Sequence, residues 1–268
     1  MKVSNKVVVV TGAGNGMGRE MTLQLLSRGA KVFGVDLKAE LLAETSKIAG
    51  DSPDFKSLAL DITDRAAVAK LPAAVEAAFG EADILINNAG IIQPFVKVND
   101  LSIEAADRVM NVNFNGPLNL IKAFLPVLLS RPEAQIANVS SMGAYGPVPG
   151  QTVYGASKAA LKLLTEGLRS EMIGTNVTVT LIYPGAVGTH IAENSLPGAK
   201  MPGADSAASS KFKMTSPQDA GRIMIDGIEA GKARVFVGSD ASGLDKIMRL
   251  MPVKGAAIIA NQMKDLLK

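Results

Sequence analysis

Seven short runs of β-branched and other apolar residues alternate along the chain with longer segments of helical periodicity. Strands separated by crossover helices form a parallel sheet with helices on both faces, so this alternation constrains the fold most. The runs predict strands near residues 6–11, 31–36, 55–61, 83–87, 134–140, 176–183 and 234–237. The periodic segments predict helices near 16–28, 38–49, 64–79, 102–130 (with a break at Gly116 and Pro117), 152–173 and 217–230. We therefore expect an α/β fold with a doubly wound, seven-stranded parallel sheet.

The size and composition of the chain fit one domain over residues 1–268, because 47% hydrophobic and 20% charged residues allow a large core. A net charge of +3, no tryptophan and 4% aromatic residues give no support to a nucleic-acid groove. The chain has no cysteine and one histidine, His190, so disulfides and thiolate or histidine-rich metal sites are excluded and a reducing cytoplasm is expected. We find no secretory signal and no apolar run of about 18 residues that could span a membrane.

Two segments fall outside the alternation. Residues 188–216 are rich in Gly, Ala, Ser and Pro, which favours a lid over a site, the alternative being a surface insertion without structure. Residues 240–268 have apolar positions at helical spacing flanked by lysines, which predicts a C-terminal helical extension. We expect this extension to pack on the core or on a partner subunit; binding to a membrane surface is the alternative that its basic polar face leaves open.

Glycine occupies four of the eight positions of "TGAGNGMG", residues 11–18, at the end of the first predicted strand. Glycine inside a strand or helix costs about 0.5–1 kcal/mol relative to alanine, so the cluster needs a reason. One possible reason is that the glycines form a tight turn. The other is that they form a loop whose backbone N–H groups bind a pyrophosphate. The second predicted strand ends in Asp36, about 20 residues later, where a dinucleotide ribose needs an acceptor. This favours dinucleotide binding, although the glycine spacing is not G-x-G-x-x-G.

Further polar motifs follow the other predicted strands. They are Asp61, "NNAG" at 87–90, Ser140 with Ser141, and "PGAVGT" at 184–189. Because the carboxyl ends of parallel strands lie at one edge of the sheet, we expect all of them to converge on one ligand site at the switch point.

The motifs taken together resemble the classical short-chain dehydrogenase/reductases. The shared pattern is Thr-Gly-x-x-x-Gly-x-Gly, Asn-Asn-Ala-Gly, a serine thirteen residues before Tyr-x-x-x-Lys, and "PGAVGT", in order from about residue 5 to 189. The resemblance implies a Rossmann fold, a homodimer or homotetramer, and catalytic roles for Asn113, Ser141, Tyr154 and Lys158.

The chemistry of the Tyr-x-x-x-Lys pair can be argued from the residues. Tyr154 and Lys158 are four apart in a predicted helix and share a face. An ammonium there, with a positive nicotinamide ring, lowers the phenol pKa from about 10 and makes Tyr154 a usable proton donor and acceptor. The resemblance adds that Ser141 binds the substrate oxygen, that Lys158 also binds the nicotinamide ribose, and that Asn113 keeps a helix distortion and positions a water. The alternatives are a surface Tyr–Lys pair, serines that only end a strand, and an asparagine in a turn.

Cofactor contacts also follow from the resemblance. They are Gly12, Asn15, Gly16, Met17, Gly18, Asp36, Leu37, Asp61, Ile62, Asn87, Asn88, Ala89, Gly90, Tyr154, Lys158, Pro184, Gly185, Val187 and Thr189. The carboxylate of Asp36 repels a 2′-phosphate, and Leu37 stands where many NADP users carry arginine, which favours NAD over NADP. Arg19 and Lys38 would soften this preference, or are ordinary solvated helix residues.

The sequence thus predicts an NAD-dependent oxidoreductase that interconverts a secondary alcohol and a ketone by direct hydride transfer. The expected pocket is apolar, with Met142, Ala144, Tyr145, Val148, Pro149, Ile191 and Leu196; His190 either faces it or is a plain loop residue. A non-catalytic dinucleotide-binding regulatory protein is the alternative, and a serine hydrolase is disfavoured because no G-x-S-x-G is present. Apolar residues of helices 102–130 and 152–173 suggest a subunit interface, including Leu120, Phe124, Leu128, Leu161, Leu164 and Leu168.

Overall fold

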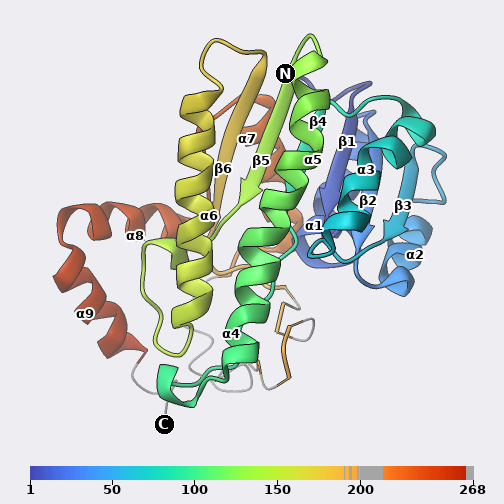
Figure 1. The fold of residues 1–268 in the computed structure, drawn as a ribbon. Helices are drawn as coiled ribbons and strands as arrows, with labels where there is room; N and C mark the ends of the chain where they lie inside the picture. Colours follow the sequence, from blue (N-terminus) through green and yellow to red (C-terminus); the bar gives the residue numbers. More distant parts are fainter. Residues whose placement is uncertain (190, 193–194, 198, 200–213, 264–268) are drawn as a thin grey trace.

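A seven-stranded parallel sheet in the order β3-β2-β1-β4-β5-β6-β7 forms the centre of the chain (Figure 1). The computed structural model describes residues 1–189, 191–192, 195–197, 199 and 214–263. Its strands are β1 (Val7–Thr11), β2 (Lys31–Asp36), β3 (Phe55–Ala59), β4 (Ile84–Asn87), β5 (Ala134–Val139), β6 (Val177–Pro184) and β7 (Arg234–Val237). The order reverses between β1 and β4, which puts a switch point at the carboxyl ends of these two strands. The predicted doubly wound sheet is confirmed.

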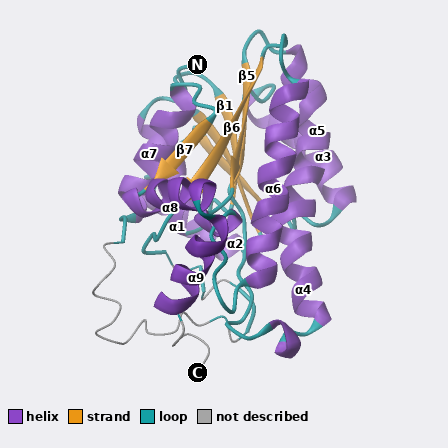
Figure 2. Cartoon of the chain, turned by 90° about the vertical axis from the view of Figure 1, so that its left-hand side faces the viewer, coloured by secondary structure: helices purple, strands orange, loops and turns teal. Residues whose placement is uncertain are grey.

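Helices cover both faces of this sheet, as Figure 2 shows. On one face lie α1 (Gly16–Ser27), α2 (Ala39–Ile48) and α7 (Pro217–Glu229); on the other lie α3 (Arg65–Phe79), α5 (Gly116–Ser130) and α6 (Thr152–Glu171). Each face has its own hydrophobic core, with Met21 and Met224 in one and Leu71 and Phe124 in the other. Strands buried on both faces are apolar throughout rather than alternating, which explains the run "VVVV" in β1.

The apolar residues of α5 and α6 that suggested a subunit interface belong instead to the interior of the chain itself. Leu120, Phe124, Leu128, Leu161 and Leu168 are buried, and Leu164 packs partly buried beside them. That part of the prediction is wrong, because α5 and α6 need these side chains to cover the sheet. Leu129 and Leu163, on the same helices, are exposed instead.

The break predicted in segment 102–130 lies earlier than expected. After a short 3-10 turn, η1 (Val98–Asp100), helix α4 (Ile103–Met110) continues through a single π-helical turn, η2 (Asn111–Asn115), directly into α5. Pro117 does not break the helix: it lies in the first turn of α5, directly after the π-helical turn, in which the Gly116 N–H donates to the Asn111 carbonyl oxygen. The distortion is therefore centred on Asn113 and not on Gly116 and Pro117.

Two further helices, α8 (Ser239–Leu250) and α9 (Pro252–Gln262), follow β7. Helix α8 packs on the loop after β5: the Tyr145 hydroxyl donates to the carbonyl oxygen of Ala241 at 2.6 Å, and a Cβ on Gly146 would lie against Leu244. Most of the predicted lid and all of His190 fall outside the described residues. Among the helices of the described part, none has the length and hydropathy to cross a membrane.

Candidate active site

The loop between β1 and α1 is shaped by its glycines. Gly12 and Gly16 have φ angles of +68° and +53°, which other residues rarely adopt. A Cβ on Gly18 would overlap the carbonyl oxygen of Gly12, so α1 packs directly on the loop. Asn15 caps α1, its Oδ1 accepting from the Gly16 N–H at 2.6 Å. The result is a side-chain-free cradle at a helix N-terminus, a geometry suited to an anion.

A cleft opens beside this cradle, at the carboxyl ends of the central strands. Twelve of the predicted cofactor residues line it: Gly12, Asn15, Gly16, Met17, Asp36, Leu37, Asp61, Ile62, Asn88, Ala89, Gly90 and Thr189. The buried Asn87 and the predicted residues Gly18, Tyr154, Lys158, Pro184, Gly185 and Val187 do not line it. Thr189 lies across the cleft from the cradle, 3.5 Å from where a Cβ of Gly16 would be.

Asp36 is fixed at the end of β2 by two backbone donors. Its Oδ2 accepts from the Gly14 N–H at 3.0 Å and its Oδ1 from the Lys38 N–H at 3.2 Å. Of the two cations considered from sequence, Lys38 lines the cleft. Arg19 does not: it donates to the Gly14 carbonyl oxygen at 2.6 Å and pairs with Glu44 at 2.8 Å. A ligand in the cleft would therefore meet the carboxylate of Asp36 and the side chain of Lys38, but not Arg19.

Asp61 is held by a partner that sequence reasoning missed. The Arg108 guanidinium on α4 lies 3.3 Å from its Oδ2, and Thr63 donates to its Oδ1 from both the backbone (2.9 Å) and the hydroxyl (2.7 Å). Partial burial raises the pKa of Asp61, but the Thr63 hydrogen bonds and the Arg108 charge outweigh it and hold that pKa below its ordinary value. Arg108 itself lines the cleft, so this end of the site contains an ion pair.

The "NNAG" segment is clamped to the end of β1. Thr11 Oγ1 accepts from the N–H groups of Asn88 (3.0 Å) and Ala89 (3.1 Å), and Asn88 Nδ2 donates to the Thr11 carbonyl oxygen at 2.9 Å. Asn88 Oδ1 is buried and has no hydrogen-bond partner among the described residues. A cleft residue thus keeps a spare acceptor, which fits a ligand rich in hydroxyl groups.

Ser141 and Tyr154 come together beside a short 3-10 turn, η3 (Met142–Ala144). The Ser141 Oγ accepts from the Gly143 N–H at 3.0 Å, and its hydroxyl stands close enough to the Tyr154 phenol to lower the pKa of that phenol. A Cβ on Gly143 would lie 3.4 Å from both the Ser141 Oγ and the Tyr154 ring. Burial raises the pKa of Tyr154, and the hydrogen bond with Ser141 opposes this only in part. The expectation that this pKa is lowered is wrong for this structure, because desolvation dominates.

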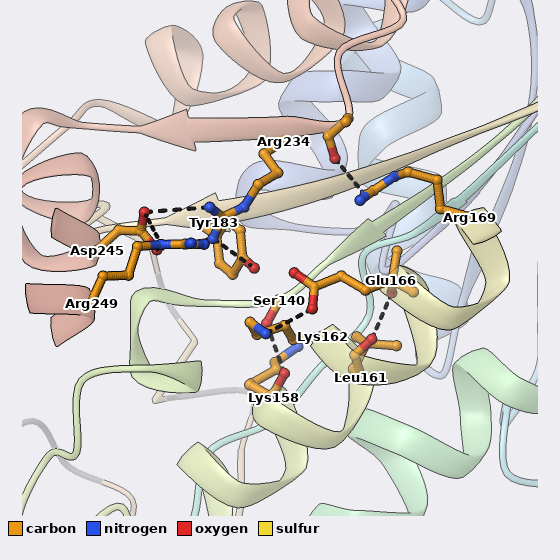
Figure 3. A network of polar contacts seen from close by, with 12 residues as sticks. Ser140, Lys158, Leu161, Lys162, Glu166, Arg169, Tyr183, Arg234, Asp245 and Arg249 are labelled. Carbon is orange, nitrogen blue, oxygen red and sulfur yellow. Dashed lines mark hydrogen bonds and ion pairs between the residues drawn. The ribbon is translucent and has the colours of Figure 1, made fainter. Parts of the chain in front are cut away.

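Lys158 is buried one helical turn further along α6. Its Nζ donates to the Val139 carbonyl oxygen at 3.0 Å, and burial lowers its pKa to about 8. A Cβ on Gly90 would lie 3.0 Å from this Nζ and 3.1 Å from Asn113 Oδ1, so both groups stand directly behind a residue that lines the cleft. The Ser140 hydroxyl, which donates to the Lys158 carbonyl oxygen at 2.9 Å, ties α6 to the end of β5 (Figure 3).

Asn113 connects the π-helical turn to its surroundings. Its Oδ1 accepts from the Ile91 N–H and its Nδ2 donates to the Ile91 carbonyl oxygen, both at 2.9 Å. The same Nδ2 lies 3.0 Å from the Ser157 hydroxyl on α6. Asn113 is fully buried and does not line the cleft. The distortion expected there is present, and it turns the Asn113 amide toward the segment after "NNAG".

The loop after β6 is held by the start of α8. The Ala186 N–H donates to Asp240 Oδ2 at 2.7 Å, and a Cβ on Gly185 would overlap the same carboxylate. Val187 forms a parallel bridge with Thr215. Nothing in the sequence singled out Asp240, since its contact with Ala186 spans 54 positions.

A second cluster, seen in Figure 3, fixes α8 against the edge of the sheet. Arg234 on β7 pairs with Asp245 at 2.9 Å and lies over the rings of Tyr183 and Phe236. Arg249 pairs with the same Asp245 at 3.0 Å. This cluster holds α8 beside the loop that carries Tyr145.

Comparisons with known proteins find a matching family and relatives over most of the chain. A family model described as "short chain dehydrogenase" matches residues 6–200. A Mycobacterium tuberculosis protein named "Putative oxidoreductase SadH" is 35% identical over 254 residues, covering 92% of this chain and 91% of its own. An uncharacterized oxidoreductase of Staphylococcus aureus (strain MW2) is 33% identical over 218 residues, 80% of this chain and 93% of its own.

Solved structures show the same architecture. A short chain dehydrogenase from Burkholderia cenocepacia in complex with NADP has a TM-score of 0.80 at 28% identity, covering 97% of this chain and 99% of that one. A 3-ketoacyl-(acyl-carrier-protein) reductase from Brucella melitensis complexed with NADH has a TM-score of 0.78 at 26% identity, covering 89% and 98%.

Proposed function

The chain belongs to the short-chain dehydrogenase family, and from that premise we propose that it is an NAD-dependent oxidoreductase that interconverts a secondary alcohol and a ketone. The observation that carries the proposal is the pairing of the Ser141 hydroxyl with the Tyr154 phenol, one helical turn from a buried lysine. These three groups, with Asn113, are the catalytic residues of the proposal.

The cleft residues fit a dinucleotide. Gly12, Asn15, Gly16, Met17 and Gly18 would take the pyrophosphate, and Asp36 with Leu37 the adenosine ribose. The adenine would lie beside Asp61 and Ile62. Asn88, Ala89 and Gly90 would lie beside the adenosine ribose, with the unpaired Asn88 Oδ1 as a hydrogen-bond acceptor. Pro184, Gly185, Val187 and Thr189 would face the nicotinamide end. When bound, the nicotinamide supplies or accepts the hydride.

Proton transfer is the task of Tyr154. In the reductive direction its hydroxyl donates a proton to the substrate oxygen, which Ser141 holds by a hydrogen bond where negative charge develops. Since burial raises the pKa of Tyr154, the phenol is protonated at neutral pH and ready for this direction. In the oxidative direction Tyr154 must start as the phenolate in order to take a proton, and the ammonium of Lys158 favours that phenolate. Lys158 also fits contact with the ribose next to the nicotinamide, because its Nζ stands behind Gly90.

The preference for NAD rests on Asp36. Two backbone N–H groups hold its carboxylate at the cleft, where it would accept hydrogen bonds from ribose hydroxyls and repel a 2′-phosphate. Arg19 pairs with Glu44 and so does not offset this repulsion. Similar solved structures are described with NADP and with NADH, so family membership alone does not decide the preference.

The substrate of the proposal is apolar. Ile191 lines the cleft, and Met142, Ala144 and Tyr145 surround Ser141 without adding a charge. We also propose a cytoplasmic homodimer or homotetramer, to be measured by light scattering in solution.

A panel of secondary alcohols and ketones, assayed with NAD(H) and NADP(H) in parallel, tests the proposal. We expect turnover of apolar members with NAD(H), and its loss in Tyr154→Phe. A protein that binds NADH but turns over nothing in the panel would favour the non-catalytic alternative, a dinucleotide-binding regulatory protein.

A further inference from the structure

We propose that Gln93 is a positioning residue that holds the first turn of α6, and with it the Tyr154 phenol, in place beside Ser141. The inference rests on the proposed function of Tyr154 and Ser141. It adds a residue that neither the sequence motifs nor the cleft lining indicated.

The side chain of Gln93 is fully buried and fully engaged at the N-terminus of α6. Its Oε1 accepts two backbone hydrogen bonds, from Val153 at 2.8 Å and from Tyr154 at 3.0 Å. Its Nε2 donates to the Gly150 carbonyl oxygen at 3.0 Å. One amide therefore holds both the loop before the helix and the backbone of Tyr154.

Helix α6 needs this outside partner. The first N–H groups of a helix have no intrahelical acceptor, and a Ser, Thr, Asp or Asn side chain at the N-cap normally serves them. Here the N-cap is Gln151, whose side chain makes no capping bond and instead donates from Nε2 to the Gln93 carbonyl oxygen at 2.8 Å. Gln93 thus accepts the hydrogen bonds that an N-cap side chain would normally accept, although it belongs to another segment. Gln151 in turn fixes the backbone of Gln93 through its own side-chain amide.

The segment that carries Gln93 is anchored at a second point. Asn113 binds both the N–H and the carbonyl of Ile91, and also reaches Ser157 on α6. Residues 91–93 therefore connect the π-helical turn to α6 on both sides of Tyr154. Gln93 does not line the cleft, so its effect on the reaction must pass through the position of Tyr154.

Two substitutions separate capping from packing. Gln93→Met keeps the length of the side chain but removes both acceptor bonds and the donor bond to the Gly150 carbonyl oxygen. Gln93→Glu keeps an acceptor for the N–H groups of Val153 and Tyr154, and in its protonated form it can also donate to the Gly150 carbonyl oxygen. We expect kcat for a substrate of the panel to fall by about 10- to 100-fold in Gln93→Met, because misplacement of a reacting group by about 1 Å costs this much. Gln93→Glu should recover most of the loss, and the NADH dissociation constant should be unchanged in both.

Gln135→Met is the matched control. Gln135 is also a buried glutamine, on β5, and its Nε2 donates to the Thr180 hydroxyl at 2.8 Å, away from the residues of the site. It should keep the wild-type kcat. Equal losses of kcat in Gln135→Met and Gln93→Met, or in Gln93→Glu and Gln93→Met, would overturn the proposal, as would a folded Gln93→Met with wild-type kcat.

Amide hydrogen exchange over residues 150–156, measured without substrate, makes the test independent of turnover. Faster exchange there in Gln93→Met, and not in Gln93→Glu, supports the positioning role; unchanged exchange in Gln93→Met refutes it. If the wild type turns over no substrate, the proposed function fails and exchange alone decides the role of Gln93. Should Gln93→Met not fold, Gln93→Asn replaces it, because the shorter side chain withdraws the acceptor while remaining polar.

Discussion

Replacing the buried Lys158 by methionine should stabilise the fold while it abolishes the proposed reaction. Lys158 is 4% exposed, and burial lowers its pKa from the ordinary 10.5 to about 8. A shift of this size corresponds to about 3 kcal/mol of unfavourable free energy for keeping the ammonium buried below pH 8. The hydrogen bond from Nζ to the Val139 carbonyl oxygen returns about 1 kcal/mol. Lys158→Met should therefore raise the free energy of unfolding at pH 7 by about 2 kcal/mol.

The sign of this effect should change with pH. Because the folded-state pKa lies below the unfolded-state value, the unfolded chain binds more protons between pH 8 and 10.5, and wild-type stability rises with pH across this window relative to the variant. Near the upper end the desolvation cost has vanished and only the hydrogen bond distinguishes the two proteins. There Lys158→Met should be the less stable by about 1 kcal/mol.

Guanidinium chloride unfolding followed by circular dichroism, for both proteins at pH 7 and pH 10, measures this difference. The chain has no tryptophan, so its fluorescence is not a useful probe, and the salt screens surface charges while leaving the buried amine unaffected. A variant less stable than wild type at pH 7, or an equal difference at both pH values, would refute the reasoning.

Four more predictions follow from the site. Tyr154→Phe should lower kcat by about 10²–10⁴-fold, as measured by initial rates, with the NADH dissociation constant retained. Asp36→Ala should raise kcat/KM with NADP relative to NAD, and an unchanged ratio would exclude Asp36 from cofactor choice. Gly18→Ala should cost on the order of 3 kcal/mol in denaturant unfolding, because the added Cβ overlaps the Gly12 carbonyl oxygen. Wild-type ketone reduction should decline with rising pH while alcohol oxidation increases, since the pKa of Tyr154 is raised and only oxidation needs the phenolate; parallel pH profiles would contradict this.

The sheet could be predicted from the sequence because its signals are local. Each strand is a short apolar run of its own, as β1 and β2 show. The glycine loop could be read for a similar reason: Gly12 and Gly16 have positive φ angles, which is a local property of the backbone, and Gly18 packs on Gly12 six positions away.

What the sequence could not provide depends on distant contacts and on burial. Arg108 meets Asp61 across 47 positions, and Gln93 meets Tyr154 across 61. The pKa of Tyr154 was predicted in the wrong direction because helical spacing shows a neighbouring ammonium but not how completely the surrounding chain removes water. Pro117 misled for a related reason, since the sequence does not show the π-helical turn that directly precedes it.

Helix α8 contacts the loops that follow two different strands of the catalytic edge, Ala186 through Asp240 and Tyr145 through Ala241. Exchanging the C-terminal segment between homologous proteins would therefore also change the two loops beside the proposed substrate site. We expect selectivity for the proposed substrate to change with such an exchange, while the proposed adenosine contacts, which lie on β1 to β4, are retained.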